Sequence, residues 1–299
     1  PVEALQAGAP NNGPKRPPGE PLLRIEDVSV TFGGLKALDQ VSFDVAEGSI
    51  TALIGPNGAG KTTLFNAIDR QQALTTGSIS LGETDLVRLA PAEAARQGMA
   101  RTFQNLRIFE NMSVLENVLV GCHRHERSGF WSCCLGLPRQ RAEERRSRET
   151  AMEVLAMVGL DELCDRPATS LPYGQRRLVE IARALASKPR LLLLDEPAAG
   201  MNTAERADLV KKIAAIRASG ITILLVEHDI DLVMGISDFV NVLNYGELIA
   251  SGSAEEVRTD ARVIEAYLGA EGQRETIQAA RVRGEVTGED VLVVENLVT

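Results

Sequence analysis

Short, fully apolar runs recur along the second half of the chain. Leu191–Leu194 and Thr222–Val226 are short runs that consist, apart from Thr222, of large aliphatic residues, and each is followed directly by an acidic residue. Runs of this kind are typical of strands that are buried on both faces of a parallel sheet. We therefore predict two core strands here, whose C-terminal ends carry polar side chains to one edge of the sheet.

A different periodicity appears between residues 139 and 158. An Arg- and Glu-rich stretch, 139–149, leads into apolar residues at helical spacing on one face, and these are Ala151, Val154, Leu155 and Val158. This pattern predicts an amphipathic helix. Strands that alternate with helices indicate an α/β fold, here with a helical insertion.

A third apolar run, 49–54, precedes a glycine-rich loop and a predicted helix over 62–68. The loop fits the phosphate-binding pattern GxxxxGK[ST] with Gly55, Pro56, Asn57, Gly58, Ala59, Gly60, Lys61, Thr62 and Thr63. Its backbone N–H groups and the helix N-terminus favour phosphate oxygens. Lys61 is expected to contact the β- and γ-phosphates and Thr62 to ligate Mg²⁺. The alternative is a glycine-rich turn without a ligand.

Polar residues follow both core strands. Asp195 and Glu196 end the first, at the edge where ligands of open parallel sheets bind. We expect Asp195 to hold Mg²⁺ and Glu196 to polarise the attacking water. His228 follows the second strand and is expected to contact the γ-phosphate. A solvated strand end and a helix cap are the respective alternatives. Gln104 is a weak signal by itself, because most buried glutamines satisfy backbone groups.

Composition excludes several classes of function. The formal net charge of -9 argues against a nucleic-acid surface, and no apolar run approaches the ~18 residues that span a bilayer. Nothing near the start resembles a cleaved signal. The four cysteines, which are Cys122, Cys133, Cys134 and Cys164, are expected to be reduced thiols. A cluster of Cys122–His125 with Cys133 and Cys134 could be drawn as a metal site, but its spacing matches no standard zinc pattern.

The ends of the chain differ from the middle. Residues 1–20 are rich in Pro and Gly and are predicted to form a flexible linker, and 271–290 is a second, polar linker. The segment 291–299 repeats the apolar and acidic pattern of residues 22–28. We interpret it as the first strand of a second, similar domain, with a chance match as the alternative.

In these motifs and their order, residues 22–269 resemble the nucleotide-binding domains of ABC transporters. The resemblance implies a P-loop α/β fold with an antiparallel β subdomain and a helical subdomain over about 105–188, within a domain spanning 21–270. It identifies Gly55–Thr63 with the Walker A loop, Asp195–Glu196 with Walker B and His228 with the switch histidine.

The same resemblance assigns further residues. Gln104 matches the Q-loop and is implied in catalysis and Mg²⁺ binding, and Phe32 matches the aromatic residue that stacks on adenine. The signature that acts on a partner's nucleotide is Leu171, Pro172, Tyr173, Gly174 and Gln175. The D-loop is Gly200, Met201 and Asn202. The implied ligands are ATP and Mg²⁺.

The signature departs from the common LSGGQ form at Pro172 and Tyr173. The serine hydroxyl that would reach the partner's γ-phosphate is therefore absent. Contacts to phosphate then depend on the backbone N–H groups of Gly174 and Gln175 and on the dipole of the helix that runs to about Ala186. Proline is tolerated at a helix start because the missing donor has no intrahelical partner there.

Longer stretches resemble the LivG-like subunits of branched-chain amino acid importers. They are 101–109, 195–202, 227–237, 266–269 and the insertion of about 123–150. The resemblance implies ATP hydrolysis that drives import of leucine, isoleucine and valine. No residue of this chain is expected to touch the solute, so the solute is inferred by analogy. The alternatives are a lipopolysaccharide exporter, a urea or other amide importer, and a soluble ABC ATPase outside transport.

The resemblance also implies partners and a location. Two cassettes sandwich two ATP molecules, so we expect a LivF-like second cassette, fused or separate, or a homodimer. Transmembrane permease subunits would dock near Gln104, with a periplasmic or extracellular solute-binding protein as an indirect partner. The chain is then peripheral, on the cytoplasmic face of the membrane. Trp131 lies in the insertion, where one interpretation is a contact with the permease or the membrane surface. The alternative is a hairpin that packs on its own helical subdomain.

Overall fold

The computed structural model describes residues 17–122 and 138–267. The predicted linker 271–290, the predicted strand 291–299 and the segment around Trp131 lie outside the described residues, as do Cys133 and Cys134. Of the predicted linker 1–20, the last four residues are described. Pro17 is buried, and the carbonyl oxygen of Glu20 accepts a hydrogen bond of 2.9 Å from the backbone of Glu47.

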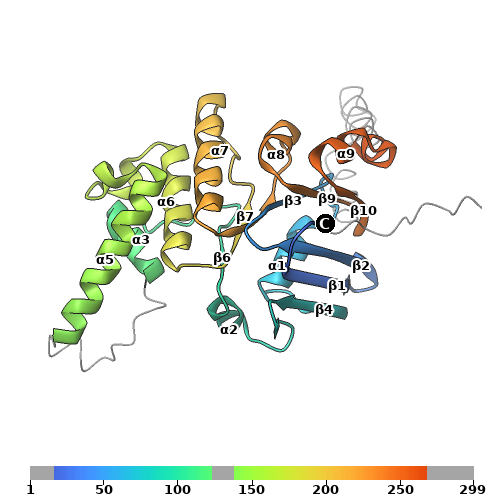
Figure 1. The fold of residues 1–299 in the computed structure, drawn as a ribbon, viewed down its shortest axis with the longest axis horizontal. Coiled ribbons are helices and arrows are strands. Elements are labelled where there is room, and N and C mark those ends of the chain that lie inside the picture. Colours follow the sequence, from blue (N-terminus) through green and yellow to red (C-terminus); the bar gives the residue numbers. More distant parts are fainter. Residues whose placement is uncertain (1–16, 123–137, 268–299) are drawn as a thin grey trace, which may run out of the picture.

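One sheet of the described chain is antiparallel, with strand order β2-β1-β4-β5 (Figure 1). Its strands are β1 (Pro21–Phe32), β2 (Leu35–Ala46), β4 (Thr76–Leu81) and β5 (Thr84–Asp85). In β1, Leu23 pairs with Val45 on one side and with Leu81 on the other. All three side chains are buried, which aligns one apolar face of the sheet toward the interior.

The second sheet has the order β10-β9-β3-β8-β7-β6. The strands β9, β3, β8, β7 and β6 are parallel to one another, and β10 pairs antiparallel with β9 at the edge. Their bounds are β3 (Ile50–Ile54), β6 (Met99–Arg101), β7 (Leu191–Asp195), β8 (Thr222–Val226), β9 (Phe239–Asn244) and β10 (Glu247–Gly252). The parallel core strands predicted from their apolar runs are confirmed.

Successive residues of β7 face two different hydrophobic cores. Leu191 and Leu193 belong to a cluster that includes helix α1 and the antiparallel sheet, whereas Leu192 and Leu194 belong to a cluster formed with the helices of the insertion. All four are fully buried. The continuous apolar run is therefore explained by burial on both faces of the strand.

Helices surround the parallel sheet and form a separate group at one end. The helices are α1 (Lys61–Ile68), α2 (Pro91–Arg96), α3 (Val114–Cys122), α5 (Pro138–Val158), α6 (Tyr173–Ala186), α7 (Thr203–Ala218), α8 (Ile230–Ile236) and α9 (Ala254–Thr259). Short 3₁₀ turns cover Asp161–Leu163 and Ala168–Ser170, and residues 261–267 are helical.

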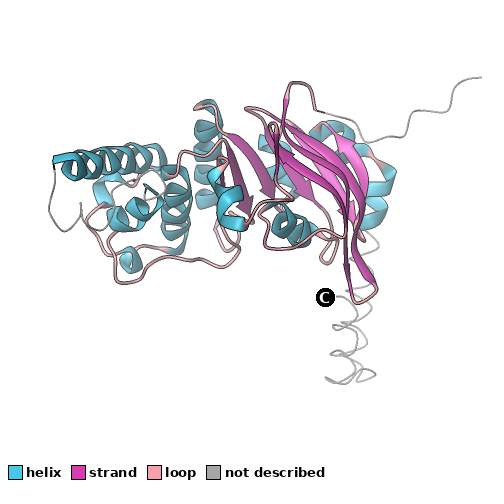
Figure 2. Ribbon diagram, turned by 90° about the horizontal axis from the view of Figure 1, so that it is seen from below, coloured by secondary structure: helices cyan, strands magenta, loops and turns pink. Residues whose placement is uncertain are grey.

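The group at one end consists of α3, α5 and α6, on the opposite side of the parallel sheet from the antiparallel sheet (Figure 1). The view from below separates the same helices from the strands (Figure 2). Ala151, Leu155 and Val158 on α5 are fully buried in this group. The amphipathic helix predicted there is confirmed. Among the described residues, no helix combines the length and the apolar character needed to cross a bilayer.

The central strands bring their C-terminal ends to one edge of the sheet. In the register of the sheet, Leu53 of β3 and Asp195 of β7 both lie opposite Val226 of β8. The residues that follow these strands, from Gly55, Glu196 and Glu227 onward, therefore start from the same edge. The fold gathers there the polar residues that the sequence places after each run.

Candidate functional site

The loop between β3 and α1 requires glycine at both of its ends. Gly55 has φ +152°, and a Cβ there would lie 2.1 Å from the carbonyl oxygen of Leu243. Gly60 has φ +103°, and a Cβ there would lie 2.7 Å from the carbonyl oxygen of Ala37. Neighbouring backbone therefore fixes the path of the loop, and only glycine fits at these two positions.

Helix α1 begins at the end of this loop without a side-chain cap. Gly60 is its N-cap residue, and the first backbone bond of the helix runs from the N–H of Leu64 to the carbonyl of Gly60. The backbone N–H groups of Lys61, Thr62 and Thr63 therefore have no partner within the helix. Such an N-terminus favours an anion.

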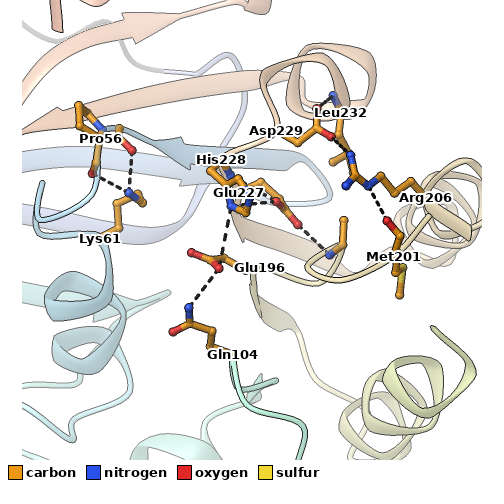
Figure 3. Close-up of polar contacts among 12 residues, drawn as sticks. Pro56, Lys61, Gln104, Glu196, Met201, Arg206, Glu227, His228, Asp229 and Leu232 are labelled. Carbon is orange, nitrogen blue, oxygen red and sulfur yellow. Dashed lines mark hydrogen bonds and ion pairs between the residues drawn. The ribbon is translucent and has the colours of Figure 1, made fainter. Parts of the chain in front are cut away.

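Lys61 folds back onto the loop that precedes it. Its Nζ donates to the carbonyl oxygens of Gly55 at 2.7 Å and Pro56 at 2.9 Å (Figure 3). Burial lowers the pKa of Lys61, and the carboxylates of Glu196 and Asp195 act in the opposite direction. A positive charge is thus held in the loop, at the edge of the sheet where the carboxylates lie.

Glu196, Gln104 and His228 meet directly beside β7 and β8. Nε2 of Gln104 donates to Oε2 of Glu196 at 3.1 Å, and Nδ1 of His228 lies 3.9 Å from the same oxygen (Figure 3). Glu196 has φ +46°, and its backbone N–H donates to Val226 over 2.9 Å. A left-handed backbone costs about 1–2 kcal/mol in a residue with a Cβ, so this conformation is maintained by the surrounding structure.

A carboxylate that the sequence analysis missed lies behind this group. The side chain of Glu227 is 1% exposed. Its Oε1 accepts from the backbone N–H of Ala198 at 2.8 Å, and its Oε2 accepts from the N–H of His228 at 3.3 Å. Burial raises the pKa of Glu227, partly offset by these hydrogen bonds and by His228. An acidic residue directly after a fully buried strand was the signal available in the sequence.

Asp195 is 4% exposed at the end of β7. Its Oδ2 accepts a hydrogen bond from the guanidinium of Arg101 at 2.9 Å, and its backbone N–H donates to Thr102 at 3.3 Å. No role was predicted for Arg101 itself from the sequence. No periodicity or spacing indicates this pair, because it joins residues of two strands that are distant in the sequence.

The predicted signature lies at the start of α6. Pro172 is the N-cap residue and no side chain caps the helix, so the N–H groups of Tyr173, Gly174 and Gln175 are without intrahelical partners. Tyr173 is 43% exposed, whereas Leu171 is buried. In the part of the chain that the structure describes, no recorded hydrogen bond or ion pair joins the signature to the loop of Lys61.

The predicted D-loop connects two parts of the site. Asn202 caps α7, since its Oδ1 accepts from the N–H of Glu205 at 3.0 Å. The carbonyl of Met201 accepts from Nε of Arg206 at 3.1 Å, and the same guanidinium pairs with Asp229 at 2.8 Å (Figure 3). Asp229 follows His228, so this loop is tied to the segment that carries the histidine.

Most of the remaining predicted residues lie at the surface. Phe32, at the end of β1, is 47% exposed, and Thr62 and Gln104 are exposed as well. Asn57 and Gly58 within the loop are exposed, whereas Ala59 is buried. The stacking role of Phe32 stays a prediction.

A family model decides the relationship of this chain to known proteins. The model described as "ABC transporter" matches residues 38–199. The chain belongs to the ABC transporter family. A second model, described as "Branched-chain amino acid ATP-binding cassette transporter", matches residues 247–273. The family predicted from the motifs is confirmed.

Individual members of the family are similar over most of the chain. The chain is 44% identical over 250 residues to the high-affinity branched-chain amino acid transport ATP-binding protein BraF of Pseudomonas aeruginosa. The aligned region covers 83% of this chain and 98% of BraF. It is also 44% identical over 251 residues to LivG of Salmonella typhimurium, with 84% and 98% of the two chains covered.

A solved ATP-binding cassette of an ABC transporter in its nucleotide-free form has the same fold. The TM-score is 0.72 at 36% identity, with 83% of this chain and 99% of that chain covered. The predicted P-loop cassette with an antiparallel subdomain and a helical subdomain is therefore confirmed. As a member of this family, the chain is an ATPase whose hydrolysis is coupled to transport.

Proposed function

We propose that this chain is the LivG-like subunit of a branched-chain amino acid importer, and that Glu196, Gln104 and His228 form its hydrolytic centre. Gln104 and His228 both approach Oε2 of the Glu196 carboxylate, and this arrangement carries the proposal. The match of residues 247–273 to the branched-chain amino acid family model supports this solute class over the lipopolysaccharide and amide systems.

The triphosphate binds at the loop Gly55–Thr63. The N–H groups at the start of α1 have no intrahelical partners, and Lys61 supplies a cation beside them. In the described state Lys61 bonds to two loop carbonyls, and these bonds are exchanged for β- and γ-phosphate oxygens when nucleotide binds. Phe32 is exposed and stacks on the adenine base.

Mg²⁺ fits the oxygen donors of the site. Thr62, Gln104 and Asp195 offer a hydroxyl, an amide oxygen and a carboxylate, which are ligands that this hard cation prefers. The described residues contain no cluster of three or more His, Cys, Asp or Glu side chains of the kind that holds a metal ion. One protein carboxylate with substrate phosphates is the usual environment of Mg²⁺ in nucleotide sites. The bound ion would neutralise charge on the phosphates.

Glu196 acts as the general base for the attacking water. Gln104 and His228 both approach Oε2 of its carboxylate, so they restrict its orientation. Glu227 supports the group from behind, because its two oxygens accept from the backbone N–H groups of Ala198 and His228. The strained backbone of Glu196 is held by its hydrogen bond to Val226.

The signature residues Leu171–Gln175 act on the nucleotide of a second cassette. The uncapped N-terminus of α6 supports this role, since its N–H groups and dipole favour phosphate. The second cassette is a LivF-like chain or another copy of this one. ATP holds the two together, and loss of the γ-phosphate releases them. The D-loop residues Gly200–Asn202 line the same interface.

The assembled subunit lies on the cytoplasmic face of the membrane. Transmembrane permease subunits dock on the helical subdomain near Gln104, and a solute-binding protein delivers leucine, isoleucine or valine to them. Closure of the two cassettes is then transmitted to the permease through the segment that contains Gln104.

The proposal is tested on the intact complex reconstituted in membranes. We expect leucine-loaded binding protein to stimulate ATP hydrolysis, and Lys61→Ala to abolish both nucleotide binding and stimulated turnover. Lys211→Ala, on the exposed face of α7, is the control and should behave like the wild type. Normal turnover in Lys61→Ala contradicts the phosphate-binding role of the loop, and stimulation only by another solute reassigns the transported class.

A further inference from the structure

Arg101 places a buried guanidinium between three segments of the site. It is the last residue of the edge strand β6, which lies beside β7 (Figure 1). Its side chain is only 6% exposed. A buried arginine is retained at low cost only where its charge and donors are matched by partners. The partners of Arg101 therefore indicate what its charge does.

The guanidinium bridges helix α1 and strand β7. One terminal nitrogen donates to Oδ1 of Asn66 at 2.8 Å and lies 3.6 Å from Oδ2 of Asp69. The other terminal nitrogen donates to Oδ2 of Asp195 at 2.9 Å. Two acceptors are thus reached by the two arms of one planar group. A lysine could supply the charge but not both directed bonds.

The same guanidinium contacts the segment that leads to Gln104. Its central carbon lies 5.4 Å from the ring centre of Phe103 and 5.5 Å from that of Phe65 on α1, both within the range of cation–π attraction. Phe103 directly precedes Gln104. A displacement of this segment therefore changes the environment of Arg101, and through it that of Asp195.

We propose that Arg101 is a positioning residue that fixes the Asp195 carboxylate for Mg²⁺ and couples it to α1 and to the segment of Gln104. This inference rests on the proposed function, in which Asp195 serves the metal ion. Arg101 touches neither nucleotide nor water in this scheme and acts through Asp195 alone.

The geometric demands of Mg²⁺ explain why such a residue is needed. The ion requires nearly octahedral geometry with short bonds, so a carboxylate that rotates freely is a poor ligand. Arg101 binds one oxygen of Asp195 and so restricts that rotation, while the bond from the backbone N–H of Asp195 to Thr102 fixes the end of β7. Partners that orient a ligand typically change metal affinity by about 10–100-fold when they are lost.

The experiment measures binding of a fluorescent ATP analogue to the full chain while Mg²⁺ is titrated, and again in EDTA. We expect Arg101→Gln to raise the Mg²⁺ concentration for half-maximal binding by about 10–100-fold. Affinity in EDTA should be unchanged, because Lys61 and the loop are intact. Arg101→Lys should be intermediate. Arg88→Gln, an arginine whose side chain is 88% exposed, is the matched control.

Asp195→Asn separates failure of this inference from failure of the proposed function. If Asp195→Asn leaves the Mg²⁺ requirement unchanged, the proposed metal site itself is wrong. If it raises the requirement but Arg101→Gln does not, the positioning role is wrong. The double variant should match Asp195→Asn alone, whereas additive effects overturn the inference.

Two further variants keep the test decisive if Arg101→Gln does not fold, as judged by circular dichroism. Asn66→Ala removes one acceptor of the guanidinium and leaves Arg101 and Asp195 in place. Asn66→Ala and Arg101→Lys should each raise the Mg²⁺ concentration for half-maximal binding, by a smaller factor than the one expected for Arg101→Gln. Wild-type behaviour of both, or an equal loss of nucleotide affinity in EDTA, shows that Arg101 is structural and overturns the proposal.

Discussion

The side-chain amide of Gln104 donates a hydrogen bond to the carboxylate of Glu196 over 3.1 Å. The two residues follow different strands of the parallel sheet, β6 and β7. Gln104 also begins the connection into the helical subdomain, so movement of that subdomain alters a contact of the carboxylate. The position of the proposed base is therefore coupled to the part of the chain that faces the permease in our proposal.

Glu196→Gln should bind ATP and fail to hydrolyse it. The neutral amide fills the same space but cannot accept a proton from water. Because the γ-phosphate persists, the two cassettes should remain associated. The measurement is size-exclusion chromatography with Mg²⁺-ATP, together with phosphate release. A species that stays monomeric with bound ATP would count against the proposal, and Glu162→Gln, at an exposed position, is the control.

His228→Ala should lower ATP hydrolysis by roughly two to three orders of magnitude while sparing nucleotide affinity, because it removes a donor to the γ-phosphate and a partner of Glu196. The histidine side chain is 60% exposed, so its loss should change the free energy of unfolding by no more than about 0.5 kcal/mol. Steady-state hydrolysis, analogue binding and urea denaturation check the three quantities. A variant that unfolds would show that His228 acts as a structural cap, which is the alternative left open by the sequence.

Much of the architecture could be predicted because it follows from local patterns. The continuous apolar runs at 191–194 and 222–226 became central strands, and the loop around Lys61 was predicted from the pattern GxxxxGK[ST] between a strand and a helix. The strand order could not be read from the apolar pattern, since each run fits any buried position in a parallel sheet. Only the family resemblance indicated how the strands and the helical subdomain assemble.

The interactions inside the site were less accessible. Arg101 bonds to residues far away in sequence, Asn66 on one side and Asp195 on the other, and no periodicity encodes such a pair. Glu227 was assigned no role from the sequence, although its carboxylate is buried and accepts from the backbone of Ala198. Buried charges need partners, but the sequence does not say which partners they have.

Gly174→Ala should weaken the start of α7 through Glu205. A Cβ at this position would lie 2.8 Å from Oε1 of Glu205, whose other oxygen accepts from the N–H of Asn202 at 3.0 Å in a capping box. Moving Glu205 breaks the bond that its side chain makes in this capping box, and that loss offsets the gain of about 1 kcal/mol that alanine brings over glycine in helix propensity, so the net change in stability should be close to zero. Chemical denaturation measures the difference.

A double-variant cycle identifies the cause of this loss. In a Glu205→Ala background the steric conflict is gone, so Gly174→Ala should stabilise the chain by about 1 kcal/mol through helix propensity. The same effect of Gly174→Ala in both backgrounds would show that Glu205 is not the obstacle. The result bears on function, because the conflict joins the proposed signature to the proposed D-loop.

Glu227→Gln should change the dependence of stability on pH. Burial raises the pKa of this carboxyl above its ordinary value of 4.5, so the folded state retains the proton to higher pH than the unfolded state does. This contribution to stability is fully present below pH 4.5 and is lost as the pH rises through the folded-state pKa. The uncharged amide has no such loss. The free energy of unfolding of Glu227→Gln, relative to the wild type, should therefore increase as the pH rises above 4.5 and level off once the folded-state pKa is passed, as measured by urea denaturation at a series of pH values. A difference that is constant with pH would show that Glu227 ionises alike in both states, and one that decreases would show that folding lowers its pKa; either result contradicts the effect of burial.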